Sequence, residues 1–543
     1  MNVNVSYMGR SQLRQSSGGQ RILDLAPNLS RDKVALDAVL KEPIRFREAI
    51  STLHDVVIND LTFKPRDKSA YEEWKKQQAS REQAMRIGAM QSARETVAAG
   101  LVPKPTADMK QQHRSALDRY WKARSQLNVR LREENETLWR RLMPYDPVIT
   151  VADDVVFFEC FSTDESSYGC LTIDRDSCFA NTQDACLGTT NVDYSWELYH
   201  NFQSLRTYRE TQFNINPEGF TVQTSNREDY HEEKIELPDG WLRGFMQLQA
   251  AMALPMKKVT LGVDAMYSLL AWLKRHREKH GPRAIRFELA DEKCPRLVLE
   301  PWNVVIESPS TVYNGPVTEP VRIWGRRRLL SLARLLPLAT QVDVYLLGTG
   351  LPSFWVVQMG NMRLTLGLSG WTTNDWTRGS AVQMLLPPSQ PSLAKVAMAA
   401  ERLSQQRTMS FNELSSGPAG ESASIMNQLA LRGQAIFDLH ANVFRWRQIL
   451  PMALSDRELG EPHPELTGVQ QIIAAKKVKV ETRHEAPRGG EIITGKVENQ
   501  SCEVLIDGDG IIRKGKCRCS WHFKFGVRNG PCRHLQALRE SIR

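Results

Sequence analysis

Apolar residues in the first quarter of the chain recur at spacings that predict two long helices. Residues 70–97 and 106–143 are rich in Glu, Lys, Arg, Gln and Ala, and the second segment carries leucines at helical intervals, Leu127, Leu131, Leu138 and Leu142. Residues 100–105 contain Gly and Pro and separate the two helices. We therefore expect an antiparallel helical hairpin over residues 67–144, after a mixed N-terminal segment, 1–66. We interpret it as a solvated spacer, with a partner-binding arm as the alternative.

Beyond Pro144 the apolar residues gather in short runs of strand length. Runs at 155–161, 213–215 and 220–223 are separated by Gly, Asp, Ser and Asn, which predicts a β-rich domain over 145–236. Longer amphipathic stretches then alternate with strand-like runs, which predicts a mixed α/β domain over 237–388.

Residues 391–452 show the order helix, helix, helix, hairpin, which is typical of a winged helix. Ser392 and Ser422 stand where they could cap the first and third helices, and the turn at 440–442 separates two strand-like runs. In such a unit the third helix would expose side chains suited to base edges, and the wing would expose side chains suited to phosphates: Asn427, Gln428, Arg432, Arg445 and Arg447. A protein-docking role for the same unit is the alternative.

A chain of 543 residues is too long for one hydrophobic core, so the predicted fold class is multidomain α+β. A hydrophobic fraction of 41% is typical of folded protein. No stretch has the length and apolarity of a signal peptide or a membrane span, so we expect a soluble, cytoplasmic protein with no membrane partner. In a reducing compartment, the nine cysteines are expected to be thiols or metal ligands rather than disulfides.

Positive charge is concentrated at the C-terminal end. The net charge is +9, and residues 511–543 hold nine basic residues against Glu540 alone. This segment nearly accounts for the whole excess of positive charge in the chain. Such an excess favours an acidic partner such as nucleic acid.

Four residues in the same segment have the spacing of a structural zinc site. Cys517 and Cys519 follow a predicted hairpin over 502–514, and Cys532 and His534 lead into a predicted helix over 535–541. Two paired ligand sets predict one zinc ion with four protein ligands, which leaves no position for a catalytic water. A site that uses His522 or Cys502 in place of one ligand is the alternative. By contrast, the wide spacing of Cys160, Cys170, Cys178 and Cys186 favours structural thiols.

The Cys-x-Cys, spacer, Cys-x-His order resembles the SWIM zinc finger family. The resemblance covers residues 472–543 and is specific at the four ligands; Arg533 stands where the family more often has Lys. It implies a zinc-binding module that contacts DNA or protein, since SWIM modules occur beside helicases, transposases and ubiquitin ligases. The remainder of the chain, including 237–244 and 369–376, is similar to long bacterial SWIM-containing proteins of unassigned function.

We therefore expect a bacterial, non-enzymatic adaptor that binds nucleic acid, DNA rather than RNA, through its two C-terminal modules and binds proteins through its N-terminal and middle domains. In the zinc finger the candidate nucleic-acid residues are Lys514, Lys516, Arg518, Lys524, Arg528 and Arg533. One alternative is a protein scaffold that uses the same modules. Another is an enzyme with a pocket at Trp371 to Trp376, although the chain has no GxxxxGK[ST], HExxH or GxSxG motif.

Overall fold

The computed structural model describes most of the chain as two compact units, Met1–Asp60 with Pro144–Arg543, and Leu61–Met143. The described residues leave out 59–87, 96–105, 135–145, 216–230, 235–238, 371–375, 377–390, 414–418, 451–463, 507–511 and several shorter segments. In the smaller unit, α3 (Ala107–Glu134) lies where the sequence predicts the second long helix. The first predicted helix falls largely outside the described residues.

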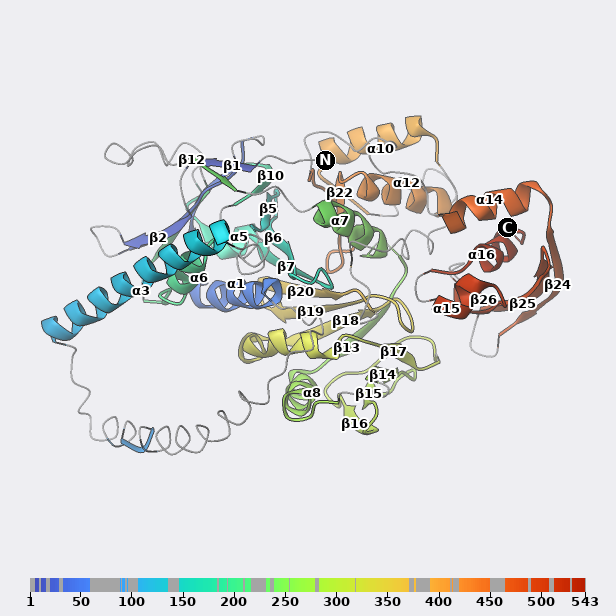
Figure 1. Cartoon of the computed structure of the whole chain (residues 1–543), viewed down its shortest axis with the longest axis horizontal. Helices are drawn as coiled ribbons and strands as arrows, with labels where there is room; N and C mark the ends of the chain where they lie inside the picture. The colour runs from blue at the N-terminus through green and yellow to red at the C-terminus, as the bar shows by residue number, and fades with distance from the viewer. Residues whose placement is uncertain are drawn as a thin grey trace. The chain divides into compact units, whose positions relative to one another are not determined.

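An eight-stranded antiparallel sheet forms the centre of the larger unit (Figure 1). Its order is β10 (Gly188–Asn191), β5 (Val148–Val151), β6 (Val155–Phe161), β7 (Ser167–Asp174), β20 (Met362–Leu368), β19 (Ser353–Met359), β18 (Gln341–Leu346) and β13 (Lys257–Leu261). β19 and β20 are buried along their whole lengths. β19 accordingly carries a continuous apolar run, 354–357, whereas β20 alternates leucines with polar or small residues. β7 lies in the predicted β-rich domain, 145–236, and β20 lies in the predicted mixed α/β domain, 237–388. Their pairing therefore joins residues of both predicted domains in one sheet.

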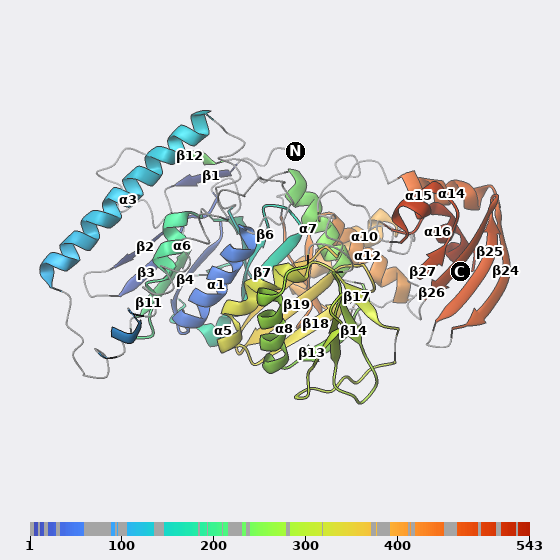
Figure 2. The same cartoon turned by 60° about the horizontal axis from the view of Figure 1, so that its bottom comes forward.

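Helices and smaller sheets surround this sheet. α1 (Pro43–Val57) packs against β7, and α8 (Val263–Arg275) packs against β18 and the 3-10 helix η1 (Arg326–Arg334) (Figure 2). One further sheet has the order β2 (Gln12–Gln15), β3 (Arg21–Leu25), β11 (Thr211–Ile215), β4 (Ala35–Leu40), β8 (Phe179–Ala180), with β9 (Ala185–Cys186) also paired to β4. Another has the order β16 (Val304–Glu307), β15 (Arg296–Leu299), β14 (Ile285–Glu288), β17 (Val321–Ile323). Other described elements before residue 390 are β1 (Val5–Met8) paired with β12 (His231–Lys234), α5 (Arg175–Cys178), α6 (Trp196–Phe202), α7 (Asp239–Met252) and η2 (Leu336–Leu338).

The described residues between 393 and 446 include two longer helices and a three-stranded sheet. Its elements are α10 (Leu393–Gln406), β21 (Thr408–Met409), α12 (Ala419–Leu431), β22 (Ala435–Asp438) and β23 (Val443–Trp446), with sheet order β21, β23, β22. The Ser392 hydroxyl accepts a hydrogen bond from Lys395 N at 3.4 Å and so caps α10, as its position in the sequence predicts. The short helix expected near 411–414 lies outside the described residues apart from Glu413.

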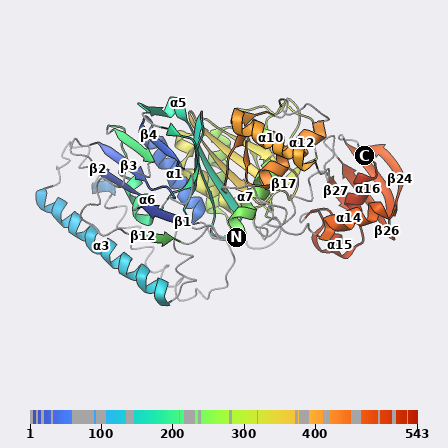
Figure 3. The same ribbon diagram turned by 90° about the horizontal axis from the view of Figure 1, so that it is seen from above.

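The C-terminal module has its own hydrophobic core. Figure 3 shows the ribbon of its helices and strands. Its elements are α14 (Pro464–Ala474), β24 (Val478–Glu485), β25 (Glu491–Val497), β26 (Gln500–Ile506), β27 (Ile512–Lys516), α15 (Ser520–Phe525) and α16 (Arg533–Glu540). The four strands pair in sequence order, and α16 packs against β25, β26 and α14 through Leu535 and Leu538, which are fully buried. The predicted hairpin and helix are therefore part of a larger unit that also includes α14, β24 and β25.

The described part of the chain thus has a mixed α/β architecture of several sheets. Among its described helices, none combines the length and the apolar character that a membrane span requires.

Candidate metal centre

Two turns bring Cys517, Cys519, Cys532 and His534 together. Cys517 and Cys519 follow β27, and Cys519 caps α15 because its sulfur accepts a hydrogen bond from His522 N at 3.4 Å. Cys532 is the residue before α16, and His534 lies in the first turn of that helix. A strand end and a helix start therefore supply two ligands each, as the sequence predicts.

The four ligand atoms have the spacing of a tetrahedral site. All of them lie within 4.8 Å of one another, and Cys517 Sγ lies 3.8 Å from His534 Nδ1. Zn–S bonds of about 2.3 Å in a tetrahedron would place two sulfur atoms about 3.8 Å apart. The three cysteines and the histidine could therefore hold one metal ion, for which their sulfur and nitrogen donors favour zinc.

The thiols of the cluster already influence each other's ionisation. Hydrogen bonds from Cys502 and Cys532 lower the pKa of Cys517 well below that of an ordinary thiol. The hydrogen bond to Cys517 in turn raises the pKa of Cys532 and, with burial, that of Cys502. A thiolate at Cys517 is the form that a metal ion binds.

Two carboxylates that sequence reasoning missed support the second ligand pair. Glu498 Oε2 lies 3.4 Å from His534 Nε2, whereas the other ring nitrogen of His534, Nδ1, faces Cys517. Glu465, in α14, accepts hydrogen bonds from Arg533 N at 2.7 Å and from the Arg533 guanidinium at 2.6 and 3.1 Å. Glu465 is 6% exposed, and its hydrogen bonds to Arg533 fix the start of α16 against α14. Neither acid lies within thirty residues of His534 in sequence, so no local motif marks them.

The alternative ligands lie outside the four-residue group. Cys502 is buried beside Cys517, and His522 contributes its backbone nitrogen to the Cys519 sulfur. Within the described residues no other group of three or more Cys, His, Asp or Glu has the spacing of a metal site. Cys160, Cys170 and Cys178 are buried free thiols, and Cys186 is a partly exposed one.

The candidate nucleic-acid residues of this module differ in their partners. Three of them form ion pairs: Lys514 with Glu319, Lys516 with Glu503, and Arg533 with Glu465. Arg518 and Lys524 are exposed, and no described residue forms an ion pair with either of them. Arg528 lies outside the described residues. Among the six candidate residues, the two exposed cations without a described ion pair, Arg518 and Lys524, therefore lie at α15 and just before it.

The arginines expected on a wing point inward. Arg445 is 3% exposed and contacts Asp154 at 2.6 Å and Asp438 at 3.0 Å. Arg447 Nη2 lies 3.1 Å from Glu159 Oε1, and both side chains are fully buried. These guanidiniums therefore join the hairpin to β6 and neighbouring segments, where a phosphate backbone does not reach.

The expected recognition face of the third helix is also largely covered. Asn427 is 4% exposed, because α12 packs against α7 as well as against α10. Gln428 and Arg432 are half-buried. The contact with α7 explains why this face is not exposed as the sequence predicts. An amphipathic pattern shows which face of a helix is apolar, but it does not show which polar residues another helix covers.

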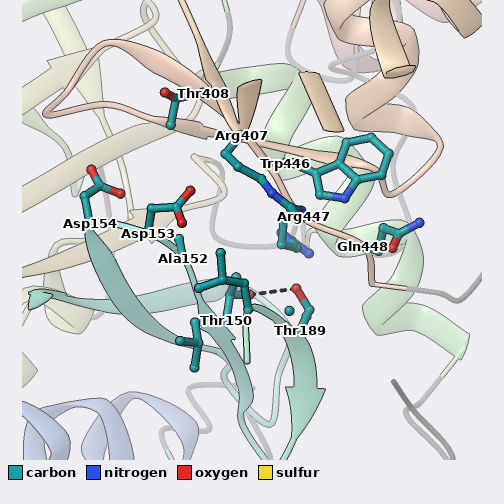
Figure 4. Close-up of a pocket in the computed structure, with 13 residues that line it drawn as sticks. Thr150, Ala152, Asp153, Asp154, Thr189, Arg407, Thr408, Trp446, Arg447 and Gln448 are labelled. Atoms are coloured by element: carbon teal, nitrogen blue, oxygen red, sulfur yellow. Dashed lines mark hydrogen bonds between the residues drawn. The ribbon is translucent and has the colours of Figure 1, made fainter. Parts of the chain in front are cut away.

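A cavity of about 250 Å³ lies between β5, β10 and the segments beside β21 and β23 (Figure 4). Its polar lining includes Thr150 and Thr189, whose hydroxyls are 3.0 Å apart, together with Asp153, Arg407 and Trp446. No nucleophile with an adjacent base occurs among the lining residues. The expected tryptophan pocket falls mostly on residues 371–375, outside the described residues, and Trp376 is 2% exposed with its ring against Phe354.

Comparison with known proteins adds little to this geometry. No family model matches the chain, and no curated protein matches it. Among solved structures, proliferating cellular nuclear antigen from Entamoeba histolytica is 14% identical, with 42% of this chain and 89% of that chain covered and a TM-score of 0.27. The PCNA2-PCNA3 complex from Sulfolobus tokodaii gives 10% identity, 42% and 90% coverage and a TM-score of 0.29. Similarities with such TM-scores carry no conclusion about this chain.

Proposed function

We propose that this protein is a zinc-binding, non-enzymatic adaptor whose SWIM-type C-terminal module binds nucleic acid. The proposal is carried by one juxtaposition: Arg518 lies between two residues of the Cys3His cluster, and Lys524 lies in the helix that Cys519 caps. A metal ion held by Cys517 and Cys519 would fix the backbone that carries Arg518. The ion would thus order a basic surface without taking part in a reaction.

Electrostatics favours a phosphate backbone as the partner of this surface. Arg518 and Lys524 are exposed, and no described acidic side chain neutralises them. Phosphodiesters attract such cations at long range and release counterions on binding. DNA is the partner we propose to test first.

The order of α10, α12, β22 and β23 supports a winged-helix-like interpretation of residues 391–452. The burial of Asn427, Arg445 and Arg447 argues that this unit packs within the protein and does not enter a DNA groove. We therefore assign nucleic-acid binding to the zinc module and protein contacts to the rest of the chain.

Binding of the full-length, zinc-loaded protein to a nonspecific DNA duplex at two salt concentrations tests the proposal. We expect affinity to fall steeply with salt, and the combined Arg518→Ala and Lys524→Ala variant to bind more weakly with a salt slope reduced by about two. Lys516→Ala is the matched control because Lys516 is already paired with Glu503. Binding that is absent, or that ignores salt, would favour the alternative proposal of a protein scaffold, which the ion pairs of Lys514, Lys516 and Arg533 support.

A further inference from the structure

The short helix α15 presents one aromatic ring to solvent. Phe523 is 90% exposed, more than any other large hydrophobic residue in the described part of the chain. A buried Phe side chain stabilises a fold by about 1.5–3 kcal/mol relative to an exposed one. Phe523 therefore contributes almost nothing to the core of its own module, and a polar residue would serve the helix equally well.

The other aromatic residues of α15 explain this orientation. Trp521 and Phe525 stand four positions apart, on one face of the helix, with ring centroids 4.7 Å apart. Trp521 Nε1 also donates a hydrogen bond to Gly530 O at 3.1 Å, which ties this face to the loop before Cys532. Phe523 is two positions from each, or about 200° around the helix, so it points away from the packed face.

Two exposed cations lie close to Phe523 in the sequence. Lys524 is the next residue and is exposed, with its Nζ 5.0 Å from the Phe525 ring. Arg518 is exposed just before the residue that caps the helix. An exposed aromatic ring next in sequence to Lys524 and five residues from Arg518, neither of which has a described ion pair, matches a ligand that alternates flat apolar faces with negative charges.

We propose that Phe523 stacks on a base of single-stranded nucleic acid whose phosphates lie against Arg518 and Lys524. This inference rests on the proposed function and names the form of nucleic acid that the zinc module prefers. Bases of a duplex are stacked on one another and expose only their edges, whereas an unpaired strand offers base faces to aromatic side chains. Any base can occupy the site, because stacking on Phe requires a flat ring and no particular hydrogen-bonding edge.

The test uses full-length, zinc-loaded protein, an oligothymidine of about 20 nucleotides and a duplex of equal length. Phe523→Ala and Phe523→Leu should weaken binding to the single strand by at least about fivefold, whereas Phe523→Trp should bind it at least as well as the parent. Duplex binding should change little in all three variants, since Arg518 and Lys524 remain. Met398→Ala is the matched control, since Met398 is 70% exposed on α10.

The outcomes separate the two proposals. If the parent binds neither form of DNA, the proposed function itself fails. If the parent binds duplex and single strand in a salt-dependent way but Phe523→Ala binds both like the parent, the stacking inference alone is overturned. If Phe523→Leu keeps parental affinity while Phe523→Ala loses it, the ring acts as an apolar contact, as in a protein-docking site, and stacking is again overturned. Zinc content measured for each variant confirms that the module is intact.

Discussion

Glu498 Oε2 lies 3.4 Å from His534 Nε2, while the other ring nitrogen of His534 faces Cys517 Sγ at 3.8 Å. A carboxylate in this position fixes the tautomer and the ring orientation of a metal-binding histidine. Glu498 is itself held by Lys477 Nζ at 3.1 Å. The candidate metal centre therefore extends beyond its four ligands to the turn between β25 and β26.

Replacing Glu498 should weaken metal binding without removing a ligand. We expect Glu498→Ala to lower zinc affinity by about 10- to 100-fold, because His534 loses the partner that orients its ring. Competition with a chromophoric chelator measures the change. Glu503→Ala is the control, since Glu503 lies in the adjacent strand β26 and contacts Lys516 instead of a ligand. Equal affinities for the two variants would contradict an orienting role.

Removal of a ligand should loosen the C-terminal module selectively. Purified protein should carry about one zinc per chain, and Cys519→Ser or His534→Ala should abolish most of it. Because metal-binding free energy in a small zinc module is largely folding free energy, limited proteolysis should then cleave within residues 464–543. The eight-stranded sheet belongs to a separate hydrophobic cluster and should survive. An unchanged C-terminal fragment in either variant would show that other residues hold the metal.

The buried pair Glu159–Arg447 should matter for stability. Burial raises the pKa of Glu159, and Arg447 and a hydrogen bond from Tyr168 at 2.6 Å oppose that shift. Arg447→Ala leaves this carboxylate buried without its cation, so we expect a loss of about 3–5 kcal/mol in the free energy of unfolding. Urea-induced unfolding measures it. Combining Arg447→Met with Glu159→Gln should recover much of the loss, and no recovery would argue that packing against Phe245 is what Arg447 provides.

The four residues that could hold a metal ion could be grouped from the sequence because each pair is local: one intervening residue separates Cys517 from Cys519 and Cys532 from His534. The two carboxylates that support these residues, Glu465 and Glu498, could not be predicted, since they reach the site only through tertiary packing. The same limit applies to Arg445 and Arg447. An arginine on a predicted hairpin has the same sequence pattern whether it faces solvent or an acid such as Glu159, 288 residues away. The joining of β7 to β20 likewise depends on a pairing that no local pattern encodes.

His54 is a 2% exposed residue of α1, and its ring stacks on Tyr199 at a centroid distance of 3.8 Å. Burial, with smaller contributions from His200 and Arg334, lowers the pKa of His54 from 6.5 to about 3. Between these values the unfolded chain binds a proton that the folded protein does not. His54 therefore contributes stability that is fully present above pH 6.5 and is lost progressively as the pH falls toward 3.

At about pH 5 this single group should reduce the free energy of unfolding by about 2 kcal/mol relative to about pH 7.5. His54→Phe keeps an aromatic ring against Tyr199 but cannot bind a proton, so its stability should fall by about that much less over the same interval. Urea titrations of parent and variant at the two pH values give the comparison. His484→Phe, at an exposed position in β24, is the control variant and should lose stability on acidification as the parent does. If His54→Phe and the parent lose stability equally on acidification, His54 does not remain neutral in the folded protein, and the acid sensitivity of the larger unit must come from other groups.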